Sequence, residues 1–140
     1  METNKELLHT IYENAAIGKQ TLGRLIKKSK DATFRNVMAE QFAEYQKLLC
    51  EAENLRNIFE TSSVAHIPRT PIFASLYLNT ALDATSSHMA EMVIQGSTMG
   101  IIDMRRQLRE LSGADTAVIS LGEKLLLIEE NNIRQMYNYV

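Results

Sequence analysis

The residues of this 140-residue chain that could do chemistry are polar side chains set within apolar repeats. Six of them stand at or beside positions that would face a helical core: Asn14, Gln41, Tyr45, Ser97, Glu129 and Asn132. Buried polar groups need hydrogen-bond partners, so we expect these side chains to form one layer across the middle of the fold. Such a layer can fix the register of packed helices, or it can bind a small ligand or be the remnant of a metal centre.

Histidine and carboxylate spacing argues against a metal site. Di-iron bundles carry Glu-x-x-His on two facing helices, but here the motif occurs once, at Glu6 and His9, and neither His66 nor His88 follows a glutamate by three residues. His88 and Glu91 have the reverse order and fall in the first turn of a predicted helix, where the helix dipole repels cations. These two are only weak metal candidates. We predict that they form a local hydrogen-bonded pair, and that the protein has no metal and no cofactor. The amides and hydroxyls of the polar layer are also poor ligands for iron or zinc.

Composition limits the remaining function classes. The net charge of −2 gives no electrostatic reason to expect nucleic-acid binding, because a binding domain normally carries a basic stripe. No apolar run approaches the roughly 20 residues that span a bilayer, and the polar METNKE start is not a signal peptide, so we expect a cytoplasmic protein without membrane insertion. The one cysteine, Cys50, cannot form an internal disulfide, and its apolar neighbours predict a buried structural thiol.

Four long helices are predicted to position these residues within a single domain, 1–140. Their apolar residues alternate at spacings of four and three, which is typical of a helix in a bundle core. The third helix shows this best, with the seam Ala90, Ile94, Ser97, Ile101, Met104, Leu108 and Leu111. The predicted bounds are about 4–29, 32–59, 88–111 and 115–139. Thr3 with Glu6 resembles a capping box for the first helix, and Ser86 or Ser87 could cap the third.

The segment 60–87 determines the topology that we expect. It is far longer than the loops of about 2–8 residues that join neighbouring bundle helices. Thr70 and Pro71 resemble a cap and a first helical residue, so a short helix is predicted over about 72–82. A connection of this length can cross the bundle from end to end, which gives the ferritin-like up-down-down-up order. The alternative is a plain up-down-up-down bundle with the short helix folded under one end.

Two stretches also carry a family resemblance: SHMAEMVIQGSTMGIIDMRRQL and GEKLLLIEENNIRQMYNYV. Here, and in LLHTIYENAAIGKQTLGRLI, the chain resembles uncharacterised bacterial ferritin-like four-helix-bundle proteins related to the spore coat protein F type. The resemblance covers most of the chain. It implies a four-helix bundle with a coat or stress role and no established catalytic activity.

We therefore expect a non-catalytic structural or protein-interaction module, with cytoplasmic or spore-associated location. The third helix has more apolar and small positions than one core uses, which favours a homodimer through the row Met89, Val93, Gly96 and Gly100. Two alternatives stay open. One is a degenerate ferritin-like metal-binding protein or oxidase, and the other is a bundle that binds a small ligand at the polar layer.

Overall fold

The computed structural model describes residues 2–59 and 84–140, and the described chain is an all-α four-helix bundle. The helices are α1 (Glu2–Lys28), α2 (Ala32–Ile58), α4 (Ser86–Glu110) and α5 (Thr116–Met136). No strand is found in these two ranges. None of the helices described there is long and apolar enough to cross a membrane. The predicted short helix over 72–82 lies outside the described residues.

Side-chain caps start three of the helices. Asp31, Thr85 and Asp115 have extended backbone and accept hydrogen bonds from main-chain N–H groups in the first turns of α2, α4 and α5. These bonds satisfy donors that a helix start leaves unpaired. The predicted cap at Ser86 or Ser87 is wrong, because Thr85 takes that role and both serines are already helical. The Thr3–Glu6 capping box is wrong for the same reason, since α1 begins at Glu2.

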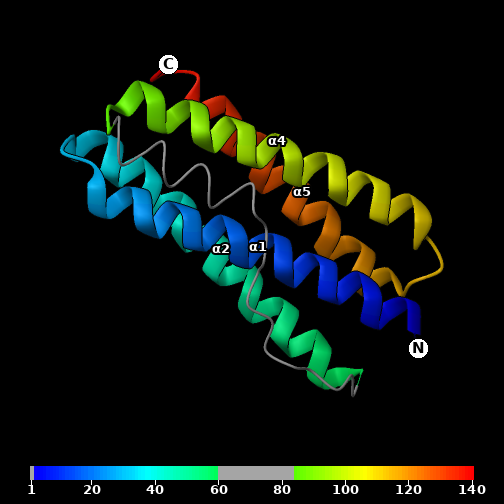
Figure 1. The fold of residues 1–140 in the computed structure, drawn as a ribbon. Coiled ribbons are helices and arrows are strands. Elements are labelled where there is room, and N and C mark those ends of the chain that lie inside the picture. The colour runs from blue at the N-terminus through cyan, green and yellow to red at the C-terminus, as the bar shows by residue number, and fades with distance from the viewer. Residues whose placement is uncertain (1, 60–83) are drawn as a thin grey trace.

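Two hydrogen bonds between distant residues establish the helix directions. The Asp115 N–H donates to Asn4 Oδ1 at 2.6 Å, so α5 and α1 start at the same end. Ser86 Oγ donates to Asp31 Oδ2 at 3.3 Å, so α4 and α2 start together at the other end. The order is therefore up-down-down-up, as the colour gradient in Figure 1 shows. This confirms the predicted order, because α2 ends at the opposite end of the bundle from the start of α4.

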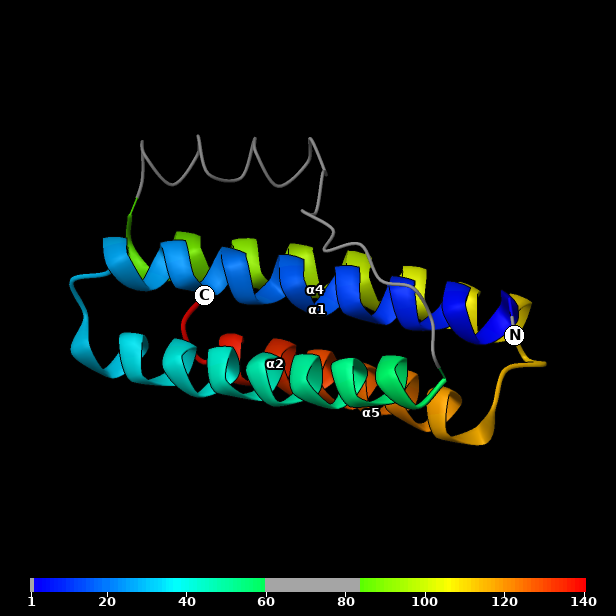
Figure 2. The same ribbon diagram turned by 90° about the horizontal axis from the view of Figure 1, so that it is seen from below.

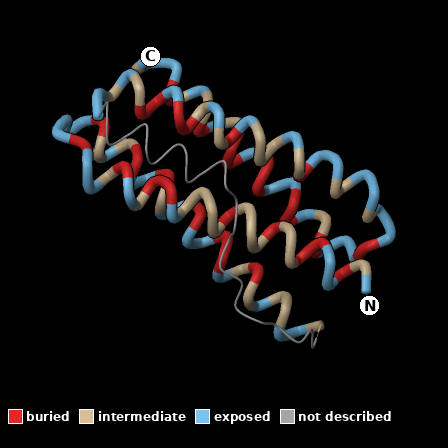
Figure 3. The backbone as a smooth tube through the Cα atoms, viewed as in Figure 1, coloured by how far each residue is buried: buried red, intermediate tan, exposed pale blue. Residues whose placement is uncertain are grey.

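The helices form two layers, α1 with α4 and α2 with α5, as Figure 2 shows. Within each hairpin, α1 packs on α2 and α4 packs on α5. The buried faces of all four helices meet along the axis of the bundle (Figure 3). Phe34, Leu48, Met104 and Leu125 are among the side chains that the core encloses almost completely.

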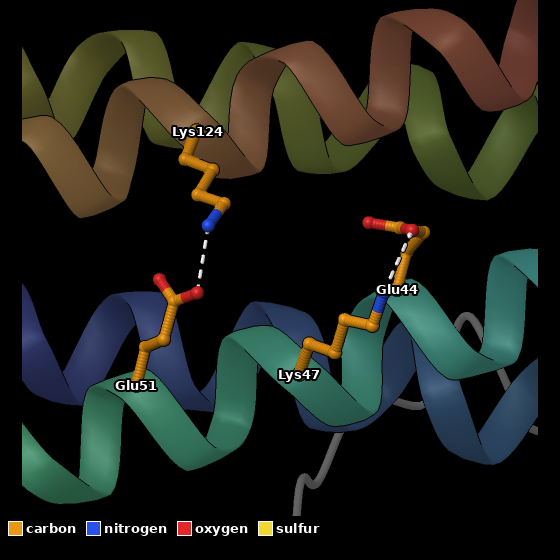
Figure 4. Close-up of polar contacts among 4 residues, drawn as sticks. All are labelled: Glu44, Lys47, Glu51 and Lys124. Atoms are coloured by element: carbon orange, nitrogen blue, oxygen red, sulfur yellow. Dashed lines mark hydrogen bonds and ion pairs between the residues drawn. The ribbon is translucent and has the colours of Figure 1, made fainter.

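The interface between α2 and α5, called the α2–α5 seam below, contains polar contacts at two heights along the bundle. Lys124 Nζ lies 2.6 Å from Glu51 Oε1 and bridges the helices at the surface, whereas the Lys47–Glu44 pair stays within α2 (Figure 4). Further along, the buried Gln41 Nε2 donates to Gln135 Oε1 at 2.9 Å.

The helix ends and the cysteine differ from expectation. The last helix ends at Met136, three residues before the predicted Tyr139, because the chain continues in turns from Tyr137. Cys50 is exposed, so the prediction of a buried thiol is wrong. Each residue turns 100° around a helix axis, so Leu48 and Leu49 face the core while Cys50 points outward.

Candidate functional site

The candidate site is a pocket of about 610 Å³ between α1 and α4. Its deep wall contains side chains from all four helices: Asn14 from α1, Tyr45 from α2, Ser97 from α4, and Glu129 and Asn132 from α5. These are five of the six residues predicted to form a polar layer. Apolar and small residues complete the inner wall, among them Ile17, Gly18, Leu22, Met92, Val93, Gly96 and Gly100.

The sixth predicted member, Gln41, does not line this pocket. It lies one helical turn before Tyr45, and it is buried against Gln135 of α5. The expected single layer therefore divides into a five-residue cluster beside α1 and α4 and a separate glutamine pair between α2 and α5. Gln135 was not identified from the sequence, because it stands outside the apolar seam of its helix.

Glu129 is the centre of the cluster. Its side chain is 2% exposed, and Tyr45 Oη donates to its Oε2 at 3.0 Å. Asn14 lies beside the carboxyl group and its Nδ2 donates to the carbonyl oxygen of Gly100 at 3.0 Å. The other carboxyl oxygen, Oε1, is buried and has no hydrogen-bond partner. Asn132 Nδ2 is likewise buried and has no hydrogen-bond partner.

Burial raises the pKa of Glu129 to about 8. The hydrogen bond from Tyr45 and the nearby Asn14 amide lower this pKa, and the negative charge of Asp103 raises it. Glu129 is therefore mostly a neutral acid at pH 7. Burial also raises the pKa of Tyr45, and the adjacent Glu129 adds to this effect, so the phenol stays protonated and can donate its hydrogen bond.

Two glycines make room for this cluster. A Cβ atom at Gly18 would fall on the ring of Tyr45, and one at Gly100 would lie 2.6 Å from Glu129 Oε2. Both are closer than real Cβ contacts. The absence of a side chain at these positions lets the ring and the carboxyl group approach the backbones of α1 and α4.

Charged residues stand only at the outer edge of the described lining. His9 pairs with Glu13 on α1, with 3.3 Å between Nε2 and Oε2, and Arg106 pairs with Asp103 on α4, with 3.9 Å between Nη1 and Oδ1. All four side chains are at least two-fifths exposed. These rim residues were not predicted as part of a site, because the sequence does not show that the two helices face each other there.

The weak metal candidates lie elsewhere. His88 and Glu91 lie in the first two turns of α4, 3.9 Å apart between Nδ1 and Oε2, and neither lines the pocket. Within residues 2–59 and 84–140, no three His, Cys, Asp or Glu side chains converge in a way that could hold a metal ion. The two side chains lie close to each other, but 3.9 Å is too long for the hydrogen bond that was predicted between them.

No protein-family model, curated protein or solved structure matches this chain. The kinship with ferritin-like and spore coat F-type proteins accordingly stays a prediction from the residues quoted above.

Proposed function

We propose that this protein binds a small organic molecule in the pocket between α1 and α4. The observation that carries the proposal is the pair of unpartnered polar atoms, Glu129 Oε1 and Asn132 Nδ2, on the deep wall of a cavity. A buried polar group without a partner costs about 1–3 kcal/mol. A ligand that supplies one partner to each atom would recover that cost on binding.

The size and walls of the pocket support the same interpretation. A volume of about 610 Å³ falls within the range of roughly 300–1,000 Å³ that is usual for small-molecule sites. Such sites combine mostly apolar walls with a few fixed polar groups. Here the apolar wall comes from α1 and α4, and the polar groups are held by the hydrogen bond from Tyr45 to Glu129.

The interaction-module hypothesis has less support from the described residues. Met89 and Val93, two members of the row proposed for a homodimer, are 0% and 5% exposed in the single chain. Gly96 and Gly100, the other two, line the pocket. The excess of apolar and small residues on this helix is thus used by the chain's own core and cavity. A homodimer, a coat or stress role, and a cytoplasmic or spore-associated location stay predictions.

Ligand screening by NMR tests the proposal. Backbone amide shifts are recorded against a library of small molecules, and binders are expected to move the signals of Gly18 and Gly100. The variant Ile17→Trp places a large ring in the pocket and should abolish this binding. Leu127→Trp is the matched control, because Leu127 is 69% exposed on α5 and does not line the pocket. If no molecule moves the pocket signals, or if Ile17→Trp binds as well as wild type, the proposal is wrong.

A further inference from the structure

The unpartnered oxygen of Glu129 also indicates what kind of ligand the pocket takes. Among the described residues it belongs to the one acidic side chain on the deep wall, and it is an acceptor once the carboxyl group has lost its proton. The polar side chains nearest the carboxyl group are Tyr45, which donates to its other oxygen, and Asn14; both are neutral, so neither neutralises a carboxylate there.

The basic side chains of the described lining already have acidic partners. Arg106 and His9 are at the rim and are paired with Asp103 and Glu13. Each rim pair holds one acid and one base, so the rim favours neither sign of charge. On the deep wall an anionic ligand would meet the carboxyl group of Glu129, whereas a cation can pair with that group in its ionised form.

We propose, resting on the ligand-binding function above, that the pocket binds a primary ammonium ion with an apolar body, and that the ammonium group takes the place of the proton on Glu129. On binding, the carboxyl group releases its proton to solvent. The ammonium N–H then donates to Glu129 Oε1, while Tyr45 continues to donate to Oε2. The apolar body lies along Ile17, Met92 and Val93, where it excludes water and strengthens the ion pair.

Proton exchange gives this inference a specific signature. With a pKa of about 8 in the free protein, Glu129 should release about 0.9 proton per ligand at pH 7. Affinity should then rise about tenfold for each pH unit up to about pH 8 and level off above it. In the described lining, the other titratable or charged groups are His9 and Glu13 on α1, Asp103 and Arg106 on α4, and Tyr45 on α2. Histidine can change charge near neutral pH, so the series is repeated in His9→Gln.

Calorimetry with octylammonium, octanol and octanoate tests the inference. The ammonium keeps its charge to about pH 10, as lysine does. At pH 8 octylammonium should bind at least about tenfold more tightly than octanol, and buffers of different ionisation enthalpy should show the released proton. Glu129→Gln keeps the shape but cannot ionise, so the preference and the proton release should both disappear while octanol binding stays. Glu130→Gln is the matched control, because Glu130 pairs with Arg105 outside the pocket.

The outcomes separate the two proposals. Equal binding of octanol and octylammonium without proton release overturns the ammonium assignment and leaves the ligand-binding function standing. Tighter binding of octanoate also overturns it and points to Arg106 instead. If none of the three probes moves the amide signals of Gly18 and Gly100, both proposals are wrong. Octanol binding also reports whether Glu129→Gln is correctly folded.

Discussion

The two seams that join the α1–α2 hairpin to the α4–α5 hairpin are built differently. Between α2 and α5, long side chains meet: Gln41 bonds to Gln135, and Lys124 reaches Glu51 (Figure 4). Between α1 and α4, glycines stand near the middle, and a cavity of about 610 Å³ remains. Between α2 and α5 the described residues line a smaller surface groove, of about 340 Å³, near the end where α5 begins.

This difference shows how one scaffold can carry both a closed seam and a binding site. The helix order is common to both seams, so the size of the side chains decides which seam is filled and which keeps a cavity. Where Gly18 and Gly100 remove side chains, Tyr45 and Glu129 project from the opposite layer into the space. The buried carboxyl group is then the feature that the closed seam lacks, and the two seams should respond differently to substitution.

The largest expected difference is in pH dependence. The pKa of Glu129 is about 8 in the folded protein, against an ordinary value of 4.5. The folded state therefore binds an extra proton between these values, and its contribution to stability, present below about pH 4.5, is lost as pH rises toward 8. Wild type should lose about 3–4 kcal/mol between pH 5 and pH 8 relative to Glu129→Gln, which mimics the neutral acid. Urea unfolding at several pH values measures this, and parallel pH profiles for the two proteins would contradict it.

The helices and their order could be predicted because both depend on sequence-wide quantities. Apolar spacing sets the helix faces, and the length of the 60–87 segment favours a connection between opposite ends. The five-residue cluster could be predicted for the same reason, since Asn14, Tyr45, Ser97, Glu129 and Asn132 come to one height once the order is known.

The wrong sequence predictions concern positions where the burial of a side chain depends on a rotation of one residue around the helix, or where its contacts depend on one specific partner. Cys50 was assigned to the core from its apolar neighbours, but it lies 100° past Leu49 around the helix. Gln41 was assigned to the cluster, but Gln135 is a nearer partner. The pocket could not be predicted, because an unfilled volume depends on how closely two helices approach and not on any single residue.

Adding a methyl group at Gly18 should give the next largest effect on stability. In Gly18→Ala the new methyl group would overlap the buried ring of Tyr45, at a cost of about 1–3 kcal/mol. Over most of this range the cost exceeds the gain of about 1 kcal/mol that alanine brings to a helix. Gly23→Ala on the same helix is the control, since its Cβ would lie 3.4 Å from Phe42, an ordinary contact, and it should stabilise. Chemical denaturation of both variants tests the contrast, which fails if Gly18→Ala is as stable as Gly23→Ala.

The buried glutamine pair should matter less than the carboxyl cluster. Gln41→Leu leaves Gln135 Oε1 without its donor, which we expect to cost about 1 kcal/mol at any pH between 5 and 8. The double variant with Gln135→Leu removes both partners and should recover part of this loss. A double-mutant cycle by urea unfolding measures the coupling. If the loss in unfolding free energy of the double variant equals the sum of the losses of the two single variants, the two glutamines are not coupled.

The surface bridge of the closed seam should have the smallest effect. Lys124 and Glu51 are about half exposed, so water and salt screen their attraction, and such pairs contribute roughly 0–1 kcal/mol. Lys124→Met keeps the aliphatic stem and should destabilise by less than about 1 kcal/mol, with the difference disappearing in 1 M salt, where the screening length falls to about 3 Å. Lys47→Met is the control, because its partner Glu44 lies on the same helix and no contact between helices is lost. A loss for Lys124→Met that persists in high salt would mean that its stem, and not its charge, joins the two helices.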